Sequence, residues 1–301
     1  MKMWRSTCVT LALLILDPAV CLTGPLLPRI AGGVDTVKGV WPWMASLHTQ
    51  SHFCGGSLIS SEWVLSAAHC FFSNSKFDVQ VHKLKVYLGM WTQEMQHNSN
   101  VIQSDVRSIH THNAYDEKTF DNDIALVRLS SPTSAYSPVL LAAQGSVIPS
   151  GTLSWITGWG QTASKGFFGM RPKDLPAPQI LQQAVISVVD NVQCHDLLKN
   201  KRRYTRITVN MICAGIPAGG VDTYCGDSGG PLMHRYDSQW VQSGITSFGY
   251  GCAKRNTPGV YTRVSQYQQW ITDIIRNQQS QNFPRFVNFP LPSAGQSSVV
   301  G

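Results

Sequence analysis

Short runs of alternating apolar and polar residues make up most of the chain from residue 30 onward. Leu84, Val86 and Leu88 alternate with more polar neighbours until Gly89 interrupts the run. Segments 185–189 and 260–264 are similarly short and rich in β-branched residues. Glycine, proline, asparagine and serine separate these runs, which is typical of many short strands. The pattern predicts an all-β barrel or sandwich.

A different period occurs once, near the end of the chain. Five large apolar residues follow the spacing i, i+3, i+4, i+7 and i+8, which places them on one face of a helix. They are Tyr267, Trp270, Ile271, Ile274 and Ile275. After about residue 277 the composition changes to glutamine, serine, asparagine and proline without a period. Residues 277–301 are therefore expected to form a flexible tail.

The N-terminus has the features of a targeting segment. Lys2 and Arg5 precede an apolar run at residues 9–16. That run is too short to cross a bilayer, which takes about 20 apolar residues. It predicts a secretory signal peptide over residues 1–21, and hence a secreted, extracellular protein in an oxidising compartment. We expect no transmembrane segment in this chain.

The composition favours a folded protein and argues against a disordered or nucleic-acid-binding one. Of 301 residues, 43% are hydrophobic and 14% charged, which is enough apolar material for a large core and argues against disorder. The net charge of +7 is scattered except between residues 199 and 206, which read as a solvated loop rather than a polyanion site. We expect no nucleic-acid partner. The clustered basic residues are Lys199, Lys201, Arg202, Arg203 and Arg206.

The cysteines suggest disulfides rather than a metal site. Of eight, Cys8 lies in the signal segment and Cys21 at its end, which leaves six. Six cysteines allow 15 pairings, so counting does not choose among them. A zinc site is disfavoured because no Cys-x-x-Cys pair exists. No metal and no cofactor are expected.

Three short motifs carry the candidate chemistry. The sequence GDSGGP at 226–231 places a serine on a tight turn, AAHC occupies 67–70, and DNDIAL occupies 121–126. A serine hydroxyl becomes a good nucleophile only when a base removes its proton. With histidine, aspartate and serine in this chain order, the sequence resembles the chymotrypsin/trypsin family of serine proteases. The resemblance covers about residues 30–276 and is nearest the channel-activating, tryptase and testisin branch. It implies two antiparallel β-barrels with a C-terminal α-helix, and the active site between the barrels.

The resemblance implies a role for each motif residue. Ser228 is the nucleophile, His69 the general base and acid, and Asp123 the residue that orients the imidazole. The backbone N–H groups of Gly226 and Ser228 form the oxyanion hole. The implied disulfides are Cys54–Cys70, Cys194–Cys213 and Cys225–Cys252.

The substrate pocket is expected to accept arginine or lysine. Asp222 lies six residues before Ser228, the family position that attracts a basic side chain. However, two residues rather than one separate Asp222 from Cys225, so the cysteine is one place closer to Ser228. The other expected substrate contacts are Ser247, Phe248, Gly249 and Gly259, and Phe120 is expected beside Phe248.

The segment before the family domain resembles a zymogen activation site. Cleavage between Arg29 and Ile30 would remove a propeptide, residues 22–29, and free an ammonium on Ile30. That ammonium is expected to pair with Asp227, because neither charge is stable when buried alone. An activating trypsin-like protease is the implied partner, together with protein or peptide substrates and protein protease inhibitors.

Two departures from the family pattern remove disulfides. Ser154 and His234 stand where many relatives carry a bonded cysteine pair, so neither leaves an orphan thiol. Leu140 replaces the cysteine that tethers many propeptides, which leaves Cys21 without its expected mate. The alternative function is a weakly active or inactive homologue that acts as a binding module, and the shifted Cys225 is the one feature in its favour.

Overall fold

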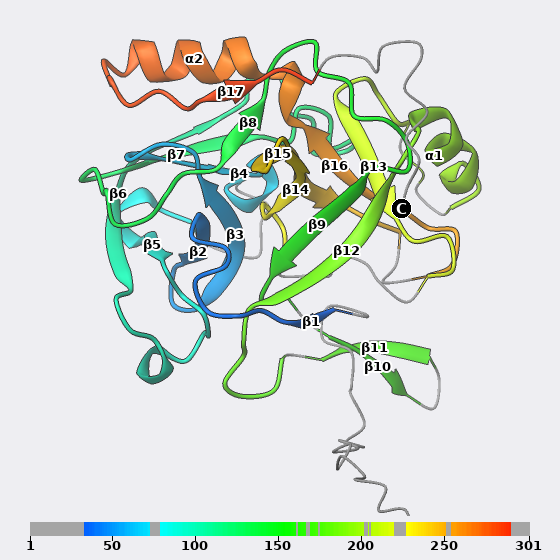
Figure 1. Ribbon diagram of the computed structural model, residues 1–301, viewed down its shortest axis with the longest axis horizontal. Coiled ribbons are helices and arrows are strands. Elements are labelled where there is room, and N and C mark those ends of the chain that lie inside the picture. Colours follow the sequence, from blue (N-terminus) through cyan, green and yellow to red (C-terminus); the bar gives the residue numbers. More distant parts are fainter. Residues whose placement is uncertain are drawn as a thin grey trace, which may run out of the picture.

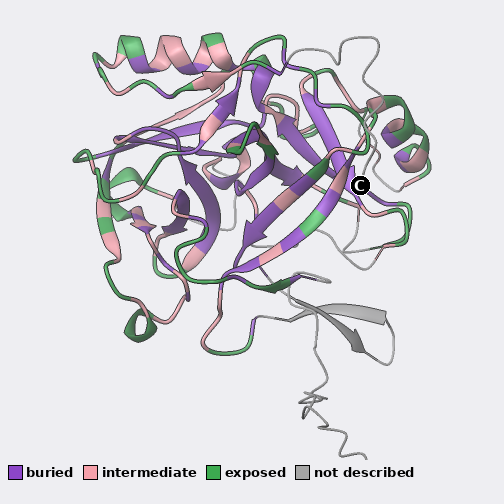
Figure 2. Ribbon diagram, in the orientation of Figure 1, coloured by how far each residue is buried: buried purple, intermediate pink, exposed green. Residues whose placement is uncertain are grey.

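The computed structural model describes residues 33–72, 79–160, 175–201, 204, 206–219, 227–250 and 254–289, and the backbone of 162–166 and 169–173. The predicted signal peptide and propeptide lie outside these residues. Most of the described chain is β-structure, and its buried residues line the interiors of two adjoining barrels (Figures 1 and 2). No helix among the described residues is long and apolar enough to span a membrane.

The N-terminal barrel closes from six antiparallel strands in the order β2-β3-β4-β7-β6-β5. Strand β7 is apolar along its length except at Arg128, and all five of its residues are buried. Fully buried strands of this kind read as continuous apolar runs rather than alternating ones. The strands are β2 Met44–His48, β3 His52–Leu58, β4 Trp63–Ser66, β5 Lys85–Leu88, β6 Ile102–Thr111 and β7 Ala125–Leu129.

The C-terminal barrel closes in the order β14-β9-β12-β13-β16-β15, because β14 pairs with both β9 and β15. In β12, buried and more exposed residues alternate, as expected when one face meets the core. These strands are β9 Leu153–Gly158, β12 Gln182–Val189, β13 Met211–Gly215, β14 Pro231–Tyr236, β15 Gln239–Phe248 and β16 Gly259–Arg263.

Smaller elements decorate the barrels. β1 (Val34–Asp35) pairs with β12, β8 (Leu140–Ala142) pairs in parallel with β15, and β10 (Thr162–Gly166) and β11 (Gly169–Lys173) form a hairpin. Short 3-10 turns occupy Ala68–Cys70, Val81–Lys83, Met95–His97 and Val264–Gln266. The prediction of two antiparallel barrels and a C-terminal helix is confirmed.

Two α-helices are present in the described residues. α1 (Asn191–Leu198) begins at Asp190, whose carboxylate accepts hydrogen bonds from the free N–H groups of Val192 and Gln193. α2 (Gln268–Asn277) follows the predicted amphipathic period and buries Ile271 and Ile275 against the N-terminal barrel core.

The predicted flexible tail is wrong for residues 278–289. β17 (Phe286–Val287) pairs in parallel with β8, and Phe289 is buried in the C-terminal barrel core. Ser280 Oγ and Asn282 Nδ2 donate to the buried carboxylate of Glu62 at 2.7 and 3.1 Å. This polar segment is therefore held by bonds to distant residues rather than by its own periodicity. Residues 290–301 lie outside the described residues.

Candidate active site

His69 lies on a 3-10 turn directly after β4, at the edge of the N-terminal barrel. A disulfide between Cys54 in β3 and Cys70 fixes this turn to the barrel. The sulfurs of Cys54 and Cys70 lie near the His69 ring, but they are bonded to each other and are not free metal ligands. The disulfide therefore limits where the imidazole can lie.

Asp123 is fully buried, and donors from both barrels surround it. Its carboxylate accepts from the backbone N–H of His69 at 2.9 Å and from Ser247 Oγ at 2.5 Å, and lies 2.7 Å from His69 Nδ1. Thr262 Oγ1 donates to the Asp123 carbonyl at 2.6 Å. His69 belongs to the N-terminal barrel, whereas Ser247 and Thr262 belong to β15 and β16. The aspartate therefore joins the barrels at the site.

The residues flanking Asp123 adopt an uncommon backbone conformation. Phe120 and Asn122 have φ values of 58° and 57°. Asparagine tolerates this left-handed region, but a bulky aromatic residue there is strained. The Asn122 side chain accepts from Tyr267 Oη at 3.1 Å and donates to the Ala114 carbonyl at 3.0 Å. These contacts stabilise the bend that places the Asp123 carboxylate beside His69 Nδ1.

The electrostatic surroundings of His69 favour its protonated form. Burial of the ring disfavours the charge, but the carboxylate of Asp123 and its hydrogen bond outweigh burial and raise the pKa of His69 above its usual 6.5. The side chain remains 20% exposed. A histidine with an open face and an anion behind it can accept a proton and stabilise the resulting charge.

Ser228 lies on the turn between Asp227 and Gly230, where strands of the two barrels approach. Its carbonyl accepts from the N–H of Gly55 in β3 at 2.8 Å, and the N–H of Gly229 donates to the Thr246 carbonyl at 2.9 Å. Gly229 has φ +81°, and a Cβ there would lie 2.2 Å from Ser66 Oγ. The turn therefore requires glycine after the serine. It brings Ser228 to the same junction as Asp123.

Asp227 points away from the turn into the C-terminal barrel, where it is 1% exposed. Its carboxylate accepts from the N–H of Gly160 at 2.8 Å. A Cβ at Gly158 would lie only 1.8 Å from this carboxylate, so the backbone has to approach it closely. The candidate activation carboxylate therefore lies in a tight, buried backbone cradle.

Aromatic rings form a row that leads away from His69. Phe120 is 6.1 Å from the His69 ring and 5.2 Å from Phe248, measured between centroids. Phe248 lies 5.9 Å from Tyr250, and Tyr250 lies 6.5 Å from Tyr204. We call these four aromatic residues the aromatic row. Gly249, between Phe248 and Tyr250, has open space where a side chain would be, and Gly259 begins β16 opposite Ala214.

Several predicted site residues lie outside the described residues. They are Asp222, Gly226, Cys225, Cys252, Arg29 and Ile30. The structure does contain the disulfide Cys194–Cys213, which links α1 to β13. It also reveals Thr262 as a support of Asp123, which the sequence pattern did not indicate. Thr262 reads as an ordinary strand residue, and only the position of β16 beside Asp123 shows the contact.

The missing disulfide is replaced by a polar pair. His234 Nδ1 lies 3.1 Å from Ser154 Oγ, and both residues are buried. Burial lowers the pKa of His234 to about 4. Its Nε2 is buried with no hydrogen-bond partner among the described residues, and the ring packs on Phe289 at 5.6 Å. The C-terminal segment thus covers the pair of Ser154 and His234.

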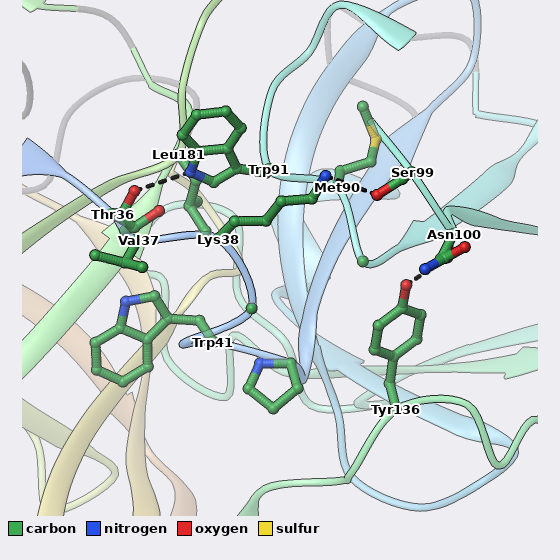
Figure 3. A pocket seen from close by; sticks show the side chains of 13 residues that line it. Thr36, Val37, Lys38, Trp41, Met90, Trp91, Ser99, Asn100, Tyr136 and Leu181 are labelled. Carbon is green, nitrogen blue, oxygen red and sulfur yellow. Dashed lines mark hydrogen bonds between the residues drawn. The ribbon is translucent and has the colours of Figure 1, made fainter. Parts of the chain in front are cut away.

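A separate pocket of about 190 Å³ lies between the segment 36–42, Trp91 and Tyr136 (Figure 3). Within it, Lys38 Nζ donates to Ser99 Oγ at 2.7 Å, and Trp91 Nε1 donates to the Thr36 carbonyl at 2.8 Å. None of the predicted site residues lines this pocket. It is therefore distinct from the His69–Asp123 site.

Comparison with known proteins agrees with this geometry. The chain matches the family described as Trypsin over residues 30–271. It is 39% identical over 250 residues to "Suppressor of tumorigenicity 14 protein homolog" of Bos taurus, covering 81% of this chain and 28% of that protein. It is 41% identical over 253 residues to "Transmembrane protease serine 7" of Homo sapiens, covering 81% of this chain and 28% of that protein. The chain belongs to the trypsin family of serine endopeptidases. The matched region spans little more than a quarter of these relatives.

Proposed function

We propose that this protein is a secreted serine endopeptidase, made as a zymogen, that cleaves peptide bonds after arginine or lysine. The observation that carries the proposal is the placement of Asp123, which binds His69 from one barrel and Ser247 from the other, beside the turn of Ser228. Burying the Asp123 carboxylate beside the partly exposed His69 does little for stability, so this arrangement is typical of a functional site.

The chemistry follows from these contacts. Ser228 attacks the carbonyl carbon of the substrate while His69 takes the hydroxyl proton at the ring nitrogen opposite Asp123. The N–H groups of Gly226 and Ser228 stabilise the oxyanion, and His69 then gives its proton to the leaving amine. Water then attacks the ester carbon while His69 takes its proton, and the acid product leaves as His69 returns that proton to Ser228 Oγ. Because His69 acts as a base only when neutral, the reaction slows as pH falls through its raised pKa.

Substrate specificity and activation are assigned to residues other than the catalytic three. Asp222 binds the arginine or lysine before the cut through a charge-assisted pair. Ser247, Phe248, Gly249 and Gly259 form the adjoining wall, with Phe120 beside Phe248. The buried cradle of Asp227 supports activation by cleavage after Arg29, because a buried carboxylate can accept the new ammonium of Ile30.

The test is to treat the purified secreted chain with a trypsin-like activator and profile cleavage on a peptide library. Arg29→Gln is the matched control, because it removes the activation site and leaves the rest of the chain intact. We expect activity to appear only in the cut parent and to favour arginine or lysine before the bond. Uncut protein that already works at the mature rate would contradict zymogen activation.

Asp222→Ser tests whether Asp222 keeps its role in the pocket despite the shifted Cys225. A strong basic preference that collapses in this variant supports the pocket role of Asp222. A weak preference that does not depend on Asp222 indicates another specificity. No cleavage at all after verified processing favours the alternative, an inactive homologue that binds rather than cuts.

A further inference from the structure

Two loops lie side by side at the far end of the aromatic row. One follows α1 and includes Lys201 and Tyr204, and the other connects Tyr250 to β16. Lys201 Nζ donates to Thr257 Oγ1 at 3.0 Å, and Tyr204 packs on Tyr250 at 6.5 Å. Tyr204 Oη also lies 2.5 Å from Nδ1 of His195 in α1. These contacts fix the two loops to each other and to the end of the aromatic row.

The two loops carry positive charge that the rest of the described chain leaves unneutralised. Arg206, Lys254 and Arg255 are exposed. Within the parts of the chain that the structure describes, no acidic side chain forms an ion pair with any of them. Lys199 differs, because its amine is paired with Asp196 at 2.7 Å. We call Lys201, Arg206, Lys254 and Arg255 the basic rim.

A substrate can reach this rim along β15. Strand β14 pairs with β15 only as far as Ile245, so among the described residues no strand flanks that edge at Ser247 and Phe248. An extended peptide can add to such an edge, and antiparallel addition places its N-terminal end toward Tyr250. The residues before the cut then cross Phe248 and Tyr250 and approach Tyr204. This orientation rests on the proposed function, because it requires the scissile bond at Ser228.

We propose that the basic rim selects substrates with acidic side chains several residues before the cut. An extended chain advances about 3.4 Å per residue, so the ring spacings along the row place Tyr204 opposite roughly the third to fifth residue before the bond. The rim residues lie in the two loops that Tyr204 and Tyr250 join. Four cations with no ion-pair partner among the described residues favour carboxylates there and repel lysine or arginine. The substrate class is therefore a single basic residue preceded by an acidic stretch.

The test compares peptides that differ only at those positions. Each has arginine before the cut, with glutamate, glutamine or lysine at the third to fifth preceding positions. For the activated parent at low salt, we expect the ratio of kcat/KM for the glutamate peptide over the glutamine peptide to be roughly tenfold. The lysine peptide should be slower than both. The ratio should fall toward one as NaCl rises, because salt screens exposed charges.

The variants assign the effect to the rim. Combining Arg206→Gln, Lys254→Gln and Arg255→Gln should bring the ratio close to one, and each single change should lower it partly. Because the ratio is taken within one variant, a general loss of folded protein cancels. Arg107→Gln is the matched control: Arg107 is exposed and lies in β6, which Figure 1 shows on the opposite side of the molecule from α1. It should leave the ratio at the parent value.

The outcomes distinguish this inference from the proposed function. Cleavage of the glutamine peptide with a ratio near one in the parent overturns the rim inference and leaves the protease intact. A tenfold ratio that survives in the triple variant assigns the preference elsewhere and also overturns it. If the parent shows no preference but its retention on a sulfated polysaccharide column is lost in the triple variant, the rim is a polyanion site instead. No cleavage of any peptide removes the proposed function and this inference with it.

Discussion

The two barrels are stabilised by different chemistry. In the N-terminal barrel, the turn of His69 is held covalently by Cys54–Cys70. In the C-terminal barrel, β9 and β14 carry the polar pair Ser154 and His234 in place of a cross-link, and Phe289 covers it. A disulfide does not depend on pH, whereas a buried histidine has to stay neutral. The comparison indicates that the C-terminal barrel relies on an acid-sensitive pair where the N-terminal barrel has a pH-independent bond.

The segment 278–289 contacts both barrels. Ser280 and Asn282 bind Glu62, which pairs with Arg128 Nε at 2.7 Å in the N-terminal barrel. Arg128 also donates to the Gln278 carbonyl at 2.9 Å. Farther along, β17 and Phe289 pack on the C-terminal barrel. The segment therefore contributes to the barrel that lacks the cross-link and ties it to the other.

The largest expected effect comes from removing a residue of the proposed catalytic site, to which both barrels contribute. Ser228→Ala should lower kcat/KM by about 10⁴-fold or more, and His69→Ala should do the same from the opposite barrel. The double variant should be scarcely worse than either single one, because the residues act as a unit. Peptide hydrolysis after activation measures this. Additive losses would show that the two barrels contribute independently.

Removal of the shared segment should have the next largest effect. A chain ending at residue 277 loses the Ser280 and Asn282 bonds to Glu62 and the cover of His234. Disturbing a buried ion pair in this way costs on the order of 4 kcal/mol of unfolding free energy. Urea denaturation of the Ser228→Ala protein measures it without self-digestion. A chain ending at residue 289 is the matched control and should keep the parental stability.

Breaking the covalent clamp should cost somewhat less. Cys54→Ser with Cys70→Ser opens a loop of sequence separation 16, which is worth about 3 kcal/mol of unfolding free energy in the chain-entropy model. Because the clamp is independent of pH, the loss should be the same at pH 7 and pH 5. A loss confined to low pH would contradict the assignment of acid sensitivity to the other barrel.

The smallest effect is the pH dependence itself. Burial lowers the pKa of His234 to about 4, whereas the unfolded ring titrates near 6.5. Between these values the unfolded state binds more protons, so stability is lost as pH falls. Lowering the pH from 7 to 5 should cost about 2 kcal/mol through this group. His234→Leu should flatten that part of the stability profile, and His97→Gln, an exposed control, should not.

A second, partly buried histidine contributes to the same pH dependence. Burial, with a smaller contribution from neighbouring His52, lowers the pKa of His48 to about 4 as well. His48 lies in β2 of the N-terminal barrel, so part of the acid loss will remain after His234→Leu. If that variant leaves the whole loss unchanged, the pair of Ser154 and His234 is not a source of acid sensitivity.

Sequence patterns predicted the β-rich fold and α2 because both depend on local signals, and the family resemblance supplied the two barrels, whereas the catalytic roles stay predictions. Alternating runs mark strands, the period at 267–275 marks α2, and the motifs around His69, Asp123 and Ser228 are compact. The segment 278–289 escaped prediction because its order comes from Glu62, more than 200 positions earlier in the chain. Thr262 escaped for the same reason, since only the register of β16 places it beside Asp123.

The proposed preference of the basic rim bears on the proposed activation at Arg29. The residues before Arg29 are Leu26, Leu27 and Pro28, and no acidic residue lies between positions 18 and 29. A protease that prefers acidic residues upstream of the cut is therefore a poor activator of its own precursor. A small amount of active enzyme would not activate more of its own precursor. The amount of active enzyme formed would instead rise in proportion to the amount of a second, activating protease.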